Sequence, residues 1–222
     1  MDNIQKNLQE LQKRIDIACG LSQRKPEDIK LVAVTKNLPS TTIRSAFDCG
    51  IRDFGENRVQ EAEGKIQELA DLRHQITWHM VGHVQSNKSK ITAGLFDIIH
   101  SVDSVKLARL LNKHAQRILP VLIQVNVSQE TTKNGFETEQ VKGAIGEISR
   151  LPNLKITGLM TIAPMVDDPE DVRPVFRELR QMRDSLGLEH LSMGMTDDFE
   201  VAIEEGATII RVGRAIFSNR RI

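Results

Sequence analysis

The chain has 222 residues, with 30 lysine and arginine residues against 30 aspartate and glutamate residues, and 40% of its residues are hydrophobic. This composition is typical of a soluble globular protein. A net charge of zero disfavours general binding to nucleic acid or anionic membrane, because both select basic surfaces. No apolar run approaches the roughly 18 residues of a membrane span, and the polar N-terminus lacks a secretory signal, so we expect a cytoplasmic protein.

The chain alternates between short β-branched runs and longer amphipathic segments, starting with a helix over residues 3–18. The expected strands cover residues 30–34, 52–54, 76–80, 96–100, 119–127, 155–160, 190–192 and 208–211. The expected helices after the first one cover residues 40–49, 57–69, 104–117, 137–150, 169–186 and 197–205.

Several of the expected strands are nearly continuous apolar runs, which is typical of strands covered on both faces. Eight strands separated by helical segments indicate an α/β fold, a single (β/α)8 TIM barrel. We expect residues 1–222 to form this one domain, with the first helix as an addition to the barrel. The alternative is an open, doubly wound sheet.

Functional residues of such a barrel lie at the carboxyl ends of its strands. Lys36 follows the first expected strand. A lysine there is most often a solvated loop residue. In the mouth of a barrel, however, a lysine flanked by apolar wall can lose its proton near neutral pH and form a Schiff base with a carbonyl compound.

The loops after the seventh and eighth strands contain Gly194 and Gly213. Glycine allows close approach of backbone to a ligand, and N–H groups at the helix starts that follow can bind an anion such as phosphate. The alternative is that both are ordinary turn glycines. The sequence alone does not separate these two interpretations.

Three further pairs of polar residues could have functional roles. Asn57 and Gln60 have capping-box spacing, so Asn57 is expected as a helix N-cap that could also face the barrel mouth. His79 and His83 are four residues apart, but methionine stands where the metalloprotease motif has glutamate, and Gly82 interrupts the segment. We therefore expect no metal site. The two cysteines, Cys19 and Cys49, are expected to be free thiols.

Six motifs, in order along the whole chain, resemble those of the YggS/PROSC family of pyridoxal-phosphate-binding proteins. They are VAVTKNLP around Lys36, FGENRVQEAEGK from Phe54, WHMVGHVQSNK from Trp78, GLMTIAP from Gly158, LSMGMTDDFEVAI from Leu191 and RVGRAIF from Arg211.

This resemblance implies a barrel similar to the N-terminal domain of alanine racemase, which would hold pyridoxal 5′-phosphate (PLP) as an internal aldimine. The residues that it assigns to the cofactor are Lys36 for the Schiff base, Ser192 and the backbone around Gly213 and Arg214 for the phosphate, Arg211 for the pyridine nitrogen, and Asn57 for the pocket wall.

The same resemblance indicates binding without catalysis. A protonated arginine at the ring nitrogen disfavours a pyridinium and weakens the ring as an electron sink. Related racemases take a second base from a tyrosine in a second domain; this chain has no tyrosine and ends soon after the eighth strand. We therefore expect no catalytic residue and a monomeric PLP carrier acting in vitamin B6 and amino-acid or keto-acid homeostasis, with PLP-dependent apo-enzymes as partners.

Two enzymatic alternatives remain. One is a weak PLP-dependent racemase or lyase that uses an unrecognised base such as His79, His83 or a cysteine. The other is a cofactor-free Schiff-base aldolase acting on a phosphorylated sugar.

Overall fold

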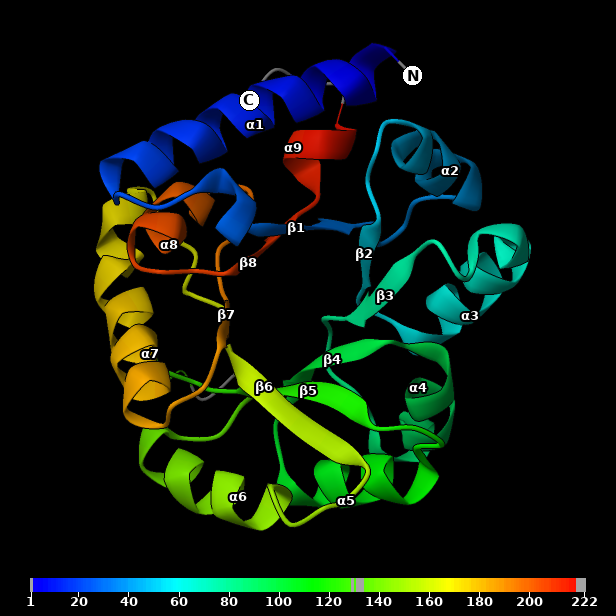
Figure 1. The fold of residues 1–222 in the computed structure, drawn as a ribbon, viewed down its shortest axis with the longest axis vertical. Helices are drawn as coiled ribbons and strands as arrows, with labels where there is room; N and C mark the ends of the chain where they lie inside the picture. Colours follow the sequence, from blue (N-terminus) through cyan, green and yellow to red (C-terminus); the bar gives the residue numbers. More distant parts are fainter. Residues whose placement is uncertain (1, 129, 131–133, 219–222) are drawn as a thin grey trace.

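The computed structural model describes residues 2–128, 130 and 134–218, in which eight parallel strands form a closed barrel. The first strand pairs with both the second and the eighth, so the sheet has no edge. This confirms the predicted barrel and excludes the open sheet (Figure 1). The strands are β1 (Lys30–Val34), β2 (Asp53–Glu56), β3 (Thr77–Met80), β4 (Ile98–Val102), β5 (Leu119–Gln124), β6 (Leu154–Met160), β7 (His190–Ser192) and β8 (Ile209–Val212).

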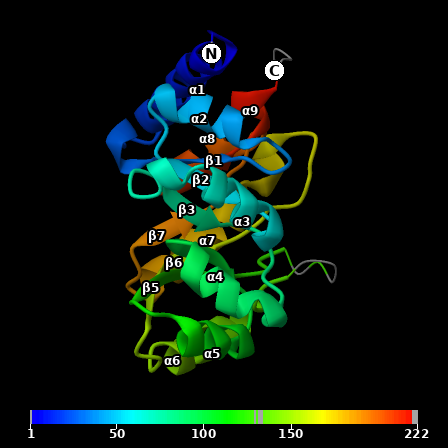
Figure 2. The ribbon, with the colours of Figure 1, turned by 90° about the vertical axis from the view of Figure 1, so that its right-hand side faces the viewer.

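The helices surround the barrel, and the additional N-terminal helix packs against the last two (Figures 1 and 2). They are α1 (Asp2–Leu21), α2 (Ser40–Asp48), α3 (Val59–Glu68), α4 (Ser89–Leu95), α5 (Val105–His114), α6 (Val141–Ile148), α7 (Arg173–Ser185), α8 (Phe199–Glu204) and α9 (Arg214–Phe217). Short 3₁₀ turns lie at Pro26–Asp28, Ala70–Leu72, Ser86–Lys88, Thr138–Gln140 and Pro169–Val172. No helix in the described part of the chain is long and apolar enough to cross a membrane.

Several elements differ from the sequence expectations. Helix α4 was not expected, because Ile91, Thr92 and Gly94 have low helix propensity and the helix has only seven residues. Strand β5 ends at Gln124 and not at residue 127. Beyond it the backbone pairs with a later segment, since the Phe136 N–H donates to the Gln124 carbonyl oxygen.

The start of α3 was also predicted wrongly. Strand β2 continues to Glu56, and α3 begins at Val59 with Arg58 as its N-cap and no capping hydrogen bond from a side chain. Asn57 lies in the bend between them. Since the chain stays extended to Glu56, the first helical turn starts too late for Asn57 to cap it.

The strands separate two cores because neighbouring residues of a strand point to opposite faces. The larger core lies between sheet and helices and contains Phe54, Trp78 and Phe96, all of them buried. A smaller cluster contains Val32, Leu122, Met160 and Ile209. Alternation along the strands places it inside the barrel, together with several buried polar side chains.

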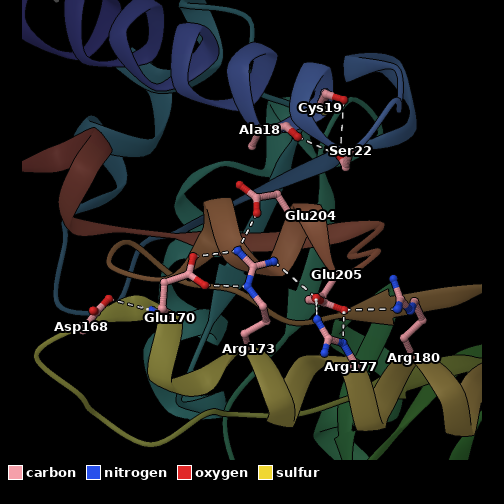
Figure 3. A network of polar contacts seen from close by, with 10 residues as sticks. All are labelled: Ala18, Cys19, Ser22, Asp168, Glu170, Arg173, Arg177, Arg180, Glu204 and Glu205. Carbon is pink, nitrogen blue, oxygen red and sulfur yellow. Dashed lines mark hydrogen bonds and ion pairs between the residues drawn. The ribbon is translucent and has the colours of Figure 1, made fainter.

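Helix α7 is joined to the end of α8 by a network of arginines and glutamates (Figure 3). Glu205 has only 5% of its side chain exposed and forms ion pairs with Arg173, Arg177 and Arg180. Arg173 also contacts Glu170 and Glu204. These contacts fix the helices that follow β6 and β7 against each other.

Candidate functional site

The turn that carries Lys36 lies at the carboxyl end of β1 and is held by α3. The Asn37 backbone N–H donates to Glu61 Oε2 at 3.2 Å, and Lys65 Nζ donates to the Thr35 carbonyl oxygen at 2.8 Å. Asn37 has a φ of 60°, a left-handed conformation that asparagine tolerates better than most residues. The side chain of Lys36 is exposed. Its primary amine is therefore accessible at the rim of the barrel.

Lys36 and Asn57 border the same hollow, which has a volume of about 220 Å³ and is also lined by Asn37, Arg58 and Glu61. The backbone of Asn57 is in close contact with the loop after β3. A Cβ added to Gly82 would lie 2.2 Å from the Asn57 carbonyl oxygen. Glycine at position 82 therefore permits the close approach that places Asn57 beside Lys36.

A buried ion pair lies behind this turn. Glu56 Oε1 accepts hydrogen bonds from Lys65 Nζ at 2.7 Å and from Thr35 Oγ1 at 2.6 Å. Glu56 Oε2 is buried without a partner among the described residues. Burial raises the pKa of the Glu56 carboxyl group, although the hydrogen bonds from Lys65 and Thr35 act in the opposite direction.

Arg211 of β8 is a buried cation, with 4% of its surface exposed. Its Nη1 donates to Ser192 Oγ at 2.7 Å and its Nη2 donates to the Thr161 carbonyl oxygen at 2.8 Å. No carboxylate of the described residues forms an ion pair with it. Burial lowers the pKa of Arg211 to about 10, although the more distant charge of Asp198 raises it.

The hydroxyl group of Ser192, the last residue of β7, has a second contact. Ser192 Oγ lies 2.7 Å from His100 Nδ1, so it is held between His100 and Arg211. Thr196, four residues later, is also buried. No hydrogen bond joins the Thr196 hydroxyl to another residue that the structure describes.

The two glycine-bearing loops have structural requirements of their own. Gly194 has a φ of +90°, and a Cβ there would lie 2.6 Å from Cβ of Ala202. A Cβ on Gly213 would lie 3.0 Å from the Val34 carbonyl oxygen at the end of β1. Gly213 therefore brings the loop after β8 directly against the strand that leads to Lys36.

Arg214, which begins α9, links the same two loops. Its exposed guanidinium forms an ion pair with Asp197 in the loop after β7. The loops after β7 and β8 are thus joined to each other by a side-chain contact, and the loop after β8 also packs closely against the backbone of β1.

The residues considered as alternative bases lie in different environments. His79 is buried inside the barrel, where its Nε2 lies 2.9 Å from Asp53 Oδ1. His83 is exposed in the loop after β3, and its Nδ1 lies 2.7 Å from Asp103 Oδ2. Cys19 is buried and Cys49 is half-buried, and both thiols are free.

Sequence reasoning missed His100, Thr161 and Thr196, as well as the role of Lys65. One signal was present: polar residues interrupt apolar strands at positions that point into the barrel, as in TWHM and IIHSV. The partners of those residues depend on barrel closure, which brings together strands far apart in the sequence.

Comparison with known proteins identifies the family of the chain. The family described as alanine racemase, N-terminal domain, matches residues 1–220. The pyridoxal phosphate homeostasis protein of Aquifex aeolicus is 44% identical over 99% of both chains. The protein of the same name from Escherichia coli K12 is 39% identical over 99% of this chain and 98% of its own. Both names describe homeostasis proteins and not enzymes.

Solved structures show the same fold. PipY of Synechococcus elongatus, described with PLP bound, has a TM-score of 0.85 and 36% identity. The match covers 97% of this chain and 100% of the PipY chain. Alanine racemase of Corynebacterium glutamicum has a TM-score of 0.73 and 16% identity, and the match covers 62% of that chain. The racemase likeness shows the barrel alone, whereas the full-length relatives show the family: this chain belongs to the pyridoxal phosphate homeostasis proteins.

Proposed function

We propose that the chain binds PLP at the carboxyl end of the barrel through a Schiff base with Lys36. We further propose that it acts as a non-catalytic carrier in vitamin B6 and amino-acid or keto-acid homeostasis, delivering PLP to apo-enzymes. The first part is supported by the relatives named above, one of which is described with PLP bound.

The observation that carries the proposal is the buried guanidinium of Arg211. A buried cation without a carboxylate is costly unless another group compensates it. Among the described residues, the hydrogen-bond partners of Arg211 are a hydroxyl and a carbonyl oxygen. An acceptor such as a pyridine nitrogen, on a ligand that also carries a phosphate dianion, fits this requirement.

The remaining groups fit the two ends of the same flat molecule. The amine of Lys36 is accessible to an aldehyde, and Asn57 lines the hollow beside it. The phosphate would be held by backbone N–H groups around Gly213 and Arg214 and by the hydroxyl of Thr196. Ser192, which is already hydrogen-bonded on two sides, would support Arg211.

The charge of Arg211 supports the proposal that the protein does not turn over amino acids. A group with a pKa of about 10 is protonated at neutral pH, so it donates a hydrogen bond to the ring nitrogen without protonating it. PLP supplies carbonyl chemistry and an electron sink when bound, and this arrangement weakens the second of these. The chain also contains no tyrosine that could serve as a second base.

Borohydride reduction of the purified protein loaded with PLP tests the proposal. We expect a yellow protein whose visible band disappears on reduction, with the added mass on the peptide that contains Lys36. K36A should lose the covalent adduct, whereas K88A, in the loop after β3, should keep it. A reduced adduct on another lysine, or a wild-type protein that takes up no PLP, would refute the site.

One observation favours a second function, a weak racemase or lyase. His83 and Asp103 form a hydrogen-bonded pair at the carboxyl ends of β3 and β4, which is an arrangement that can orient a general base. Exchange of the α-proton of amino acids in deuterated water distinguishes the two functions. The carrier proposal predicts no exchange above the rate of free PLP, and exchange that is lost in H83A would establish the enzyme.

A further inference from the structure

A chain of hydrogen bonds crosses the interior of the barrel from its amino end to Arg211. His79 Nε2 lies 2.9 Å from Asp53 Oδ1, and His79 Nδ1 lies 2.9 Å from His100 Nε2. His100 Nδ1 lies 2.7 Å from Ser192 Oγ, which accepts from Arg211. Both imidazoles are fully buried, and their rings meet edge to face at 5.1 Å between centroids.

The donors and acceptors of this chain can be assigned starting from Arg211. A guanidinium has only donors, so the Ser192 oxygen accepts its hydrogen bond. The single hydrogen of the Ser192 hydroxyl is then available for His100 Nδ1, which leaves the hydrogen of His100 on Nε2. That hydrogen points to His79 Nδ1.

The same assignment continues to the far end. With its Nδ1 accepting, His79 carries its hydrogen on Nε2 and donates it to the Asp53 carboxylate. Asp53 also accepts from Lys30 Nζ, at 3.1 Å, at the amino end of β1. Every link therefore donates in one direction, away from Arg211 and toward Asp53.

The opposite direction requires an additional proton inside the barrel. If His100 donated to Ser192, His79 would have to donate to both His100 and Asp53 and would carry a positive charge. Burial lowers the pKa of His79 and lowers that of His100 well below its usual range, and the charges of Arg211 and Lys30 lower His100 further. The neutral form of both histidines is therefore favoured.

We propose that His79 and His100 are positioning residues, neutral and protonated on Nε2, which polarise Ser192 and thereby fix Arg211 as a hydrogen-bond donor to the bound ring. This inference rests on the proposed function. It assigns Ser192 to the ring end of the site, because its only hydrogen is committed to His100 and is not available to a phosphate group.

The direction of donation along this chain of hydrogen bonds is tested in the protein without PLP. Long-range ¹H–¹⁵N correlation spectra of ¹⁵N-labelled wild-type protein at about pH 7 report which ring nitrogen of each histidine is protonated. We expect Nε2–H for both, with Nδ1 unprotonated, and assignment by comparison with single histidine variants. A proton on His100 Nδ1, or a doubly protonated His79, would overturn the proposal even if PLP binds.

The effect on the site is tested by PLP titration of H100L and H100Q, followed by the visible band. H100L removes both hydrogen bonds, and we expect PLP affinity to fall about ten- to hundredfold with a shifted band. A glutamine amide can both accept and donate, so H100Q should stay within about threefold of wild type. K30M, which removes only the outer partner of Asp53, should match wild type.

These experiments separate the two proposals. If wild-type protein binds no PLP, the proposed function fails. The ¹H–¹⁵N spectra still decide in which direction the hydrogen bonds between Arg211 and Asp53 donate. If wild type binds PLP and H100L binds it equally well with an unchanged band, the positioning role fails and the binding function stands. If H100L does not fold, the nitrogen spectra and H100Q decide, and a loss of PLP affinity of more than about threefold in H100Q or in K30M would count against the role.

Discussion

Lys65 Nζ lies 2.8 Å from the carbonyl oxygen of Thr35, the residue directly before Lys36. The same ammonium group lies 2.7 Å from the buried carboxylate of Glu56. One side chain of α3 therefore neutralises a buried charge and also fixes the backbone that leads to the proposed Schiff-base lysine. Stability and PLP binding should depend on it together.

The substitution K65M is predicted to destabilise the protein by about 3 kcal/mol, because it leaves the Glu56 carboxylate buried without its cation. Urea unfolding measures this loss, and PLP titration should show weaker binding because the Thr35 carbonyl is released. The double variant K65M/E56Q should recover most of the stability, since the buried charge is removed with its partner. R58M, which alters an exposed ion pair of the same helix, is the control and should change stability by less than about 1 kcal/mol.

Stability in acid should depend on Glu205. Burial raises the pKa of this carboxyl group, but hydrogen bonds from Arg177 and Arg173 outweigh burial, with the charge of Arg180 acting the same way, so the net pKa is lowered. A carboxyl group with a lowered pKa in the folded state contributes stability above its unfolded pKa of about 4.3. That contribution is lost as the pH falls through the lower, folded pKa.

We therefore expect E205Q to lose about 1–3 kcal/mol at pH 7, relative to wild type, because three arginines lose their shared carboxylate. The difference between the two proteins should shrink as the pH falls below about 4. Urea unfolding at a series of pH values measures it. E147Q, which affects the exposed pair with Arg109, should show almost no difference at any pH, and a pH-independent loss in E205Q would contradict the explanation.

Two glycines provide a test of the contact that fixes Asn57. In G82A the new methyl group would overlap the Asn57 backbone, with atoms 2.2 Å away. We expect a loss of about 1–3 kcal/mol in unfolding free energy and weaker PLP binding. G64A, in the middle of α3, meets nothing within 4 Å and should gain about 0.5–1 kcal/mol with unchanged binding. Unaltered PLP affinity in a folded G82A would show that the position of Asn57 does not matter.

The sequence predicted the barrel well because its signals are local. β-branched runs and amphipathic segments alternate, and the order of elements determines a parallel sheet without the need for any long-range contact. The two largest errors arose where local preference is weak. Helix α4 contains Thr92 and Gly94 and is stabilised by packing against α5 and α3. Asn57 remains outside α3 because β2 continues to Glu56.

The site was predictable only in part, for a different reason. Lys36, Asn57 and Gly213 were predicted because each follows an expected strand, and Arg211 because it ends the last one. The closed barrel places the carboxyl ends of all these strands on one rim. The contacts between residues were not predictable in the same way. Ser192 meets His100 across 92 positions of sequence, and such a pair depends on the registers of several strands at once.

The last prediction separates stability from binding at Arg211. In the protein without ligand, this cation is buried and no carboxylate within the described part of the chain contacts it. Replacing it with an apolar side chain of similar length therefore removes a desolvation cost. R211M should therefore unfold within about 1 kcal/mol of wild type, or be more stable, while its PLP affinity falls at least about tenfold. Urea unfolding of R211M and wild type measures the change in stability, and PLP titration of both proteins measures the change in affinity.

R24M is the matched control, because Arg24 is half-buried and its guanidinium donates to two backbone carbonyls, of Ile203 and Ala207, away from the proposed site. It should lose stability by about 1–3 kcal/mol and keep PLP affinity. A loss of more than about 3 kcal/mol in R211M would mean that the guanidinium is compensated within the protein itself. Arg211 would then be a structural cation, and its burial would no longer argue for a ligand that brings the missing acceptor.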